Sequence, residues 1–225
     1  MISRICKFLV RCCVLLVRKV LPEERYIRLK CNMGRFVWGV MGELGPPSGV
    51  KVGLIKDLSS RFGIKTLVET GTCRGDAIRA VLKDFNQIYS IELDESLYKG
   101  ACQRFAKFPY VHIAWGDSGE LLPVLVGKIT DRTIFWLDAH YSGGVTAGKG
   151  KGCPVVRELR AMRKARRTDH LILIDDAGSF AGETGYPHID ELCTLITAIN
   201  PSYKVEVKDN IVRAFVSDDA GVPVK

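Results

Sequence analysis

Short apolar runs alternate with longer amphipathic stretches along most of the chain. The apolar runs have the length and the β-branched content of buried strands, and they fall at 66–69, 88–91, 111–114, 134–137 and 171–174. Between them, apolar positions recur with the helical period at 76–85, 95–107, 120–128 and 154–166. This alternation predicts parallel strands joined by right-handed crossover helices.

The segments on either side complete the predicted fold. A helix at 50–63 ends at Gly63, and a later helix at 189–199 leads into two runs at 203–207 and 211–216. Lys-Asp-Asn joins these last two runs, and Asp-Asn is typical of a tight hairpin turn. The sequence therefore predicts an α/β fold with seven strands, mostly parallel, that ends in an antiparallel hairpin.

The basic residues are concentrated near the N-terminus. Residues 1–35 hold nine Lys and Arg and two acids, whereas the remaining 190 residues carry a net charge of only +1. This distribution argues against nucleic acid as a partner, because no basic surface extends over the domain. The sequence predicts three parts: a basic helix at 1–21, a helical and loop extension at 22–62, and an α/β domain at 63–225.

Four basic residues of the first part, Arg4, Lys7, Arg11 and Arg18, share one helical stripe opposite an apolar side. Arg11 interrupts the apolar run well before the ~20 residues that a spanning helix needs. Two interpretations stay open: an amphipathic helix on an anionic membrane surface, or a helix packed on the domain with its basic face in water. Eight cysteines without a CxxC pair indicate a reducing compartment, so we expect a cytoplasmic protein, with peripheral membrane association under the first interpretation.

Candidate chemistry lies where the predicted strands end, because open parallel sheets bind ligands beyond the carboxyl ends of their strands. The first strand runs into Val-Glu-Thr-Gly-Thr-Cys-Arg-Gly, in which Glu69 precedes Gly71 and Gly75. Neither a phosphate loop nor the G-x-G-x-x-G pattern is met, since position 73 is Cys. An acid before the first glycine suits a cationic ligand, although an ordinary strand-to-helix turn has the same composition.

Polar residues also follow the second and third strands. Glu92 lies 21 residues after Gly71, the spacing at which an acid accepts ribose hydroxyls, and the alternative is a helix-capping acid. Asp117 and Ser118 follow the third strand, where they can meet an adenine edge, cap the next helix, or do both.

Three carboxylates follow the fourth and fifth strands. Asp138, Asp175 and Asp176 lie at the ends of neighbouring strands if the strand order is the usual one. Clustered carboxylates repel one another and require a cation, and hard oxygen ligands indicate Mg²⁺ or a similar ion. The alternative is that the pair at 175–176 only begins a helix.

Taken in order, "VETGT..G", "YSIELD", "GDS..LLP", "LDAHYSGG" and "LIDDA" resemble class I S-adenosylmethionine-dependent methyltransferases. The resemblance is closest to metal-dependent O-methyltransferases of the catechol type and the macrolide-sugar type, and it covers roughly residues 60–216. It implies a Rossmann-like seven-stranded methyltransferase fold with S-adenosylmethionine and Mg²⁺ as cofactors.

The resemblance also implies a role for each site residue. Glu69, Gly71 and Gly75 line the methionine end of the cofactor, Glu92 takes the ribose hydroxyls, and Asp117 and Ser118 flank the adenine. The cofactor-binding set is completed by Thr70, Thr72, Leu93 and Asp138. The metal ligands are Asp138, Asp175 and Asp176.

The general base departs from both family patterns. The sugar type has a carboxylate two residues after the first metal Asp, where this chain has His140, and the catechol type has a Lys one position later, where it has Tyr141. A neutral imidazole accepts a proton near pH 7, so His140 is the predicted catalytic residue, with a hydrogen bond to a metal carboxylate as its alternative role. The glycine-rich segment that follows predicts a loop that closes over the substrate.

The predicted reaction is transfer of the sulfonium methyl to a hydroxyl of a sugar or another small polar acceptor, assisted by Mg²⁺. Two alternatives stay open: a metal-independent methyltransferase, and a non-catalytic, membrane-tethered binding protein with this fold.

Overall fold

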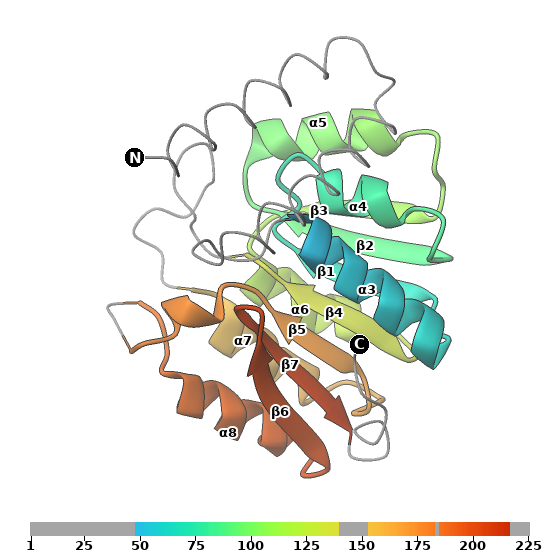
Figure 1. The fold of residues 1–225 in the computed structure, drawn as a ribbon. Coiled ribbons are helices and arrows are strands. Elements are labelled where there is room, and N and C mark those ends of the chain that lie inside the picture. Colours follow the sequence, from blue (N-terminus) through green and yellow to red (C-terminus); the bar gives the residue numbers. More distant parts are fainter. Residues whose placement is uncertain (1–47, 140–152, 183–184, 217–225) are drawn as a thin grey trace, which may run out of the picture.

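Seven strands form one sheet in the order β3-β2-β1-β4-β5-β7-β6 (Figure 1). The computed structural model describes residues 48–139, 153–182 and 185–216. The strands are β1 (Thr66–Thr70), β2 (Gln87–Glu92), β3 (Val111–Trp115), β4 (Thr133–Leu137), β5 (Leu171–Ile174), β6 (Tyr203–Lys208) and β7 (Ile211–Val216). The helices are α3 (Ser48–Phe62), α4 (Asp76–Val81), α5 (Glu95–Phe105), α6 (Ser118–Val126), α7 (Val155–Met162) and α8 (Ile189–Ile199), with a 3₁₀ turn η1 (Ala177–Ser179) after β5.

The strand directions confirm the predicted fold class. The pairs β1–β2, β2–β3, β1–β4 and β4–β5 are parallel, whereas β7 is antiparallel to both β5 and β6. Asp209 and Asn210 join β6 to β7 with φ of 53° and 57°, as a two-residue hairpin turn requires. The registers pair Thr70 with both Ile91 and Leu137, and Leu137 with Ile174, so the carboxyl ends of four parallel strands align at one edge.

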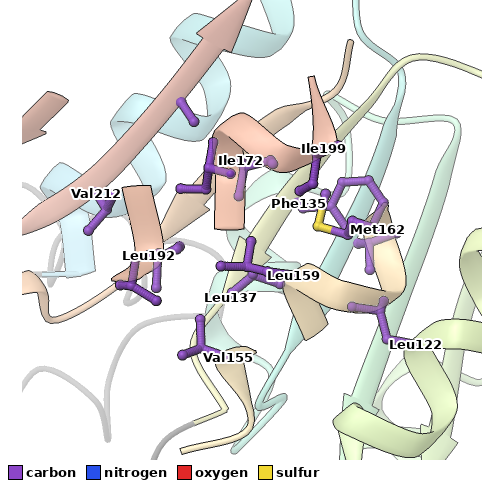
Figure 2. Packing of buried hydrophobic residues seen from close by; sticks show 14 of the residues in the cluster. Leu122, Phe135, Leu137, Val155, Leu159, Met162, Ile172, Leu192, Ile199 and Val212 are labelled. Carbon is purple, nitrogen blue, oxygen red and sulfur yellow. The ribbon is translucent and has the colours of Figure 1, made fainter. Parts of the chain in front are cut away.

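Helices cover both faces of the sheet, and alternate strand residues supply two apolar cores (Figure 1). One core joins β1, β2, β4, β5 and β7 to α6, α7 and α8. Figure 2 shows part of it, where Phe135 and Leu137 of β4 meet Leu159 and Met162 of α7. Burial on both faces explains why the central strands read as continuous apolar runs.

The opposite core joins the sheet to α3, α4 and α5. Leu54, Ile55 and Leu58 of α3 are each at most 7% exposed, and they pack with Ile134 and Trp136 of β4. The apolar face of α3 therefore fixes this helix beside the sheet, which also fixes the direction of its polar face.

Two helices end four residues earlier than their periodicity predicts. α4 ends at Val81 rather than 85, and α7 ends at Met162 rather than 166. After α7 the backbone winds into tighter turns, since the amides of Lys164 and Ala165 donate to carbonyls three residues earlier. Among the residues that the structure describes, no helix combines the length and the apolarity that crossing a bilayer requires.

Candidate active site

The turn after β1 lies directly against the end of β4. Gly71 has φ of 86°, and a Cβ built on it would lie 2.6 Å from the carbonyl oxygen of Asp138. Its amide donates to the carbonyl of Ile91, which ties the turn to β2. Only glycine combines this conformation with so close an approach. Gly75 follows with φ of 70°, and its Cβ would clash with the ring of Phe105.

Glu92 closes the same turn from the side of β2. Its Oε2 accepts the amide of Cys73 at 2.6 Å, and its Oε1 accepts the amide of Asp94 at 2.9 Å. Cys73 has φ of 50°, a conformation that brings its amide to the carboxylate. Each carboxylate oxygen accepts more than one hydrogen bond, so these contacts orient Glu92 and leave it acceptor capacity for a diol.

Glu69 is buried at the end of β1, 3% exposed. Burial raises its pKa to about 8; a hydrogen bond from Ser90 opposes this rise, while the charges of Asp138 and Glu92 add to it. Ser90 Oγ donates to Glu69 Oε2 at 2.7 Å and lies 2.6 Å from Thr72 Oγ1. Burial therefore favours the protonated form of Glu69, and a cationic ligand beside it would favour the ionised form.

Asp117 and Ser118 begin α6, as one alternative predicted. Asp117 is the N-cap and accepts the amide of Gly119 at 2.8 Å, and Arg157 of α7 donates to its other oxygen at 3.1 Å. Ser118 and Thr70 hydrogen bond to Glu158 of α7, which is 1% exposed. Burial raises the pKa of Glu158 to about 7, against these two hydrogen bonds. The capping role is thus present, and an adenine contact stays a prediction.

The three aspartates of the predicted metal site follow β4 and β5, which are neighbours in the sheet. The amide of Asp138 donates to the carbonyl of Thr70 at 3.1 Å, and the amide of Asp175 donates to that of Leu137 at 3.0 Å. Asp175 is fully buried, whereas Asp176 is partly exposed in a left-handed conformation, with φ of 50°.

A lysine that sequence reasoning missed lies at this cluster. The ammonium of Lys51, on the first turn of α3, donates to Asp175 Oδ2 and lies 3.8 Å from Asp176 Oδ1. Burial lowers the pKa of Lys51, but the carboxylates, Asp175 above all, outweigh burial and raise it overall. Asp175 Oδ1 accepts the amide of Asp176 at 2.8 Å. Both oxygens of Asp175 therefore have a donor.

Within the described ranges, no group of three or more His, Cys, Asp and Glu side chains is arranged to hold a metal ion. The charge that the aspartates require is supplied, in the described part of the chain, by Lys51. The ammonium of Lys51 therefore competes with the predicted Mg²⁺ ion for the cluster of Asp138, Asp175 and Asp176.

Some predicted positions fall outside the described residues. His140, Tyr141 and the glycine-rich loop lie in 140–152, and the basic helix lies in 1–47. Leu93, a predicted cofactor-binding residue, lies after β2, where its carbonyl accepts a hydrogen bond from Trp115 Nε1 at 3.2 Å. Beyond Lys51, sequence reasoning missed Ser90, Glu158 and Asn210. Ser90 lies two residues after the apolar Ile88 on the same predicted strand, which indicates that it shares the buried face, but nothing local to Glu158 or Asn210 indicates a place at the site.

Solved methyltransferases share this architecture. The O-methyltransferase of Bacillus cereus in complex with SAH is 12% identical, with a TM-score of 0.57 and coverage of 88% of this chain and 93% of that one. The O-methyltransferase TomG of Streptomyces achromogenes, in complex with SAM, is 14% identical, with a TM-score of 0.53 and coverage of 90% and 94%. The SAH-bound methyltransferase PaMTH1 of Podospora anserina is 12% identical, with a TM-score of 0.54 and coverage of 87% and 88%.

At these identities the likeness establishes the fold, which is the Rossmann-like methyltransferase fold. No family model and no curated protein sequence matches this chain.

Proposed function

We propose that this protein is an S-adenosylmethionine-dependent methyltransferase that acts on a hydroxyl of a small polar acceptor. The observation that carries the proposal is the held carboxylate of Glu92, which the amides of Cys73 and Asp94 orient at the end of β2, beside the Gly71 turn. An oriented acid at this place accepts a ribose diol. That similar structures were solved with SAM or SAH supports the same ligand here.

The remaining cofactor contacts follow from the order of the strand ends. Glu69, Thr70, Gly71, Thr72, Gly75 and Asp138 are proposed to surround the methionine part, and Leu93, Asp117 and Ser118 the adenine. The buried carboxyl of Glu69 suits the methionine amino group, because a cation stabilises the ionised form that burial disfavours. Thr70 and Ser118 are held in place by Glu158 behind them.

The proposed reaction moves the methyl group from sulfur to oxygen. The S–CH₃ bond breaks as the O–CH₃ bond forms, and the sulfonium becomes a neutral thioether. His140, outside the described residues, is proposed to take the hydroxyl proton, the role for which an imidazole is suited near neutral pH.

Mg²⁺ assistance does not fit the aspartates as they stand. A magnesium ion needs carboxylate oxygens at about 2.0–2.1 Å, but the ammonium of Lys51 already donates to Asp175 Oδ2 and lies 3.8 Å from Asp176 Oδ1. Coordination would first require Lys51 to leave. The chain's own contacts therefore favour the metal-independent form of the reaction, and no step of the proposal depends on a metal.

The acceptor is proposed to be a small molecule or a glycan. If the basic helix at 1–21 binds an anionic membrane, an acceptor near that surface comes within reach of the site. This part of the proposal rests on the sequence pattern of the arm and is tested separately below.

Two measurements test the proposal. Titration calorimetry should give SAH binding in the micromolar range or tighter, and tritiated S-adenosylmethionine should label one or more hydroxyl probes, such as catechol, caffeic acid and simple hexoses. Absence of SAH binding would overturn the cofactor assignment. SAH binding without transfer to any probe, lipid extract or glycan fraction would favour the non-catalytic binding protein.

A further inference from the structure

Lys51 is the only described residue whose ammonium is placed at both Asp175 and Asp176. Its side chain is only 23% exposed, and its charged end reaches Asp175 at the strand edge. Asp138 lies close enough for its charge to act on the same ammonium. The contact spans 124 residues of sequence, from the first helix of the described region to the end of β5.

We propose that the ammonium of Lys51 is the resident cation of this aspartate cluster, and that it holds the acceptor oxygen in the place where related chemistry uses a divalent metal. The inference rests on the proposed function and deepens it. It assigns the positioning of the acceptor to a residue of α3, a helix that carries none of the motifs found at the strand ends.

Lys51 and a divalent metal ion exclude each other at this cluster. The buried carboxylate of Asp175 needs a compensating positive charge, and Lys51 supplies one in direct contact. A divalent cation on the same carboxylate would lie within a few ångströms of the ammonium, and the two positive charges would repel strongly in this poorly solvated place. The cluster therefore accepts either Lys51 or a metal ion.

Lys51 also has a donor suited to the acceptor. An ammonium carries three N–H donors; one reaches Asp175 Oδ2, and Asp176 Oδ1 lies 3.8 Å from the same nitrogen. The third can donate to a hydroxyl oxygen and stabilise the negative charge that builds on it as its proton leaves. Lys51 keeps its own protons throughout, so the atom balance of the methyl transfer is unchanged.

A metal titration tests the exclusion directly. Full-length protein saturated with SAH is titrated with Mn²⁺, with binding followed by calorimetry and by the loss of free Mn²⁺ signal in electron paramagnetic resonance. The wild-type chain should bind Mn²⁺ only weakly. Lys51→Met should bind at least tenfold more tightly, Lys51→Arg should behave as wild type, and adding Asp175→Asn to Lys51→Met should remove the gain.

Wild-type protein that binds Mn²⁺ tightly at this site, with Asp175→Asn abolishing the binding and Lys51→Met leaving it unchanged, would overturn the proposal. Circular dichroism and SAH affinity check that each variant folds. If Lys51→Met does not fold, Lys51→Gln replaces it, since the amide can still donate to Asp175 but carries no charge.

Methyl transfer tests the positioning role, with whichever of the hydroxyl probes accepts label. Wild-type turnover should be unchanged in excess EDTA. Lys51→Met should raise the acceptor KM or lower kcat at least tenfold, with SAH affinity within twofold of wild type, and Lys51→Arg should recover part of the loss. Unchanged kinetics in Lys51→Met would refute this role. A wild-type chain that binds no SAH would instead refute the proposed function, while the Mn²⁺ titration would still decide the place of Lys51.

Discussion

Gly71 and Asp138 are in contact through their backbones: a Cβ on Gly71 would lie 2.6 Å from the carbonyl oxygen of Asp138. This contact closes the turn after β1 onto the end of β4. The Gly71→Ala variant should therefore lose roughly 2–4 kcal/mol of unfolding free energy, from the strained φ together with the steric clash. SAH affinity should fall as well, because the turn must move. Chemical denaturation and calorimetry measure the two effects.

Gly100→Ala is the matched control. Gly100 lies within α5, and a Cβ there meets nothing within 4 Å. Alanine should stabilise this helix by roughly 0.5–1 kcal/mol. If Gly71→Ala lowered the unfolding free energy no more than Gly100→Ala does, this result would contradict the close approach of Gly71 to the carbonyl of Asp138.

Glu92→Gln should weaken S-adenosylmethionine binding at least tenfold, which is about 1.4 kcal/mol. The substitution removes the charge and turns an amide NH₂ towards either Cys73 or Asp94, whose N–H groups both need an acceptor. Glu95→Gln is the control, since this exposed acid of α5 pairs only with Lys99 among the described residues. Equal affinities of the two variants in calorimetry would remove Glu92 from the ribose site.

The raised pKa of Glu69, about 8, predicts how stability depends on pH. Between the usual glutamate pKa of 4.5 and the folded-state pKa of about 8, the folded state holds a proton that the unfolded state has released. The unfolding free energy should therefore fall as pH rises through this window, by up to about 1.4 kcal/mol per pH unit. Glu158, with a pKa of about 7, adds the same trend up to that pH.

Glu69→Gln should flatten this dependence and be more stable than wild type above pH 8, because the amide mimics the protonated acid and still accepts from Ser90. Denaturant midpoints from pH 5 to pH 9 measure the effect, with the exposed Glu120→Gln as control. A Glu69→Gln curve parallel to that of wild type would contradict the assignment.

His140→Ala should lower kcat by roughly 10²–10⁴ without weakening SAH binding, the usual contribution of a positioned general base. The acidic limb of the pH–rate profile should disappear with it. Tyr141→Phe is the neighbouring control, and a larger loss in that variant would transfer the role from position 140 to position 141.

The predicted basic helix at 1–21 should hold the protein on anionic vesicles, since each basic residue near such a surface contributes about 1 kcal/mol. Full-length protein should sediment with anionic vesicles at low salt and be released as salt rises. The chain without residues 1–21 should stay in the supernatant. Full-length protein that also stays there would favour a helix packed on the domain.

The strand-end chemistry was predictable from sequence, because parallel strands carry their final residues to one edge. That rule alone places Glu69 and Glu92 on paired strands, and Asp138 and Asp175 after two neighbours. The helix ends at 81 and 162 were less predictable, because the periodic pattern continues past the point where backbone bonding changes.

Lys51 and Glu158 were not predictable, because each looks like an ordinary solvent-facing charge of an amphipathic helix. Lys51 lies in "SGVKVGL" and Glu158 in "VVRELRA". Their partners, Asp175 for one and Thr70 and Ser118 for the other, are distant in sequence. The packing of α3 on one face of the sheet brings Lys51 to its partner, and the packing of α7 on the other face brings Glu158 to its partners.

The turn between β6 and β7 reaches the same cluster from the C-terminal hairpin. Asn210 donates from Nδ2 to Asp176 Oδ1 at 3.3 Å, accepts the amide of Gly178 on Oδ1 at 2.7 Å, and accepts the amide of Ala177 on its carbonyl. During synthesis, the segment at 176–178 is therefore made before Asn210, the residue that holds it in place. A nascent chain halted before residue 210 would already carry Lys51 and all three aspartates, yet Asp176 would lack this anchor, so the contacts that hold Asp176 at the cluster are complete only after residue 210 has been made.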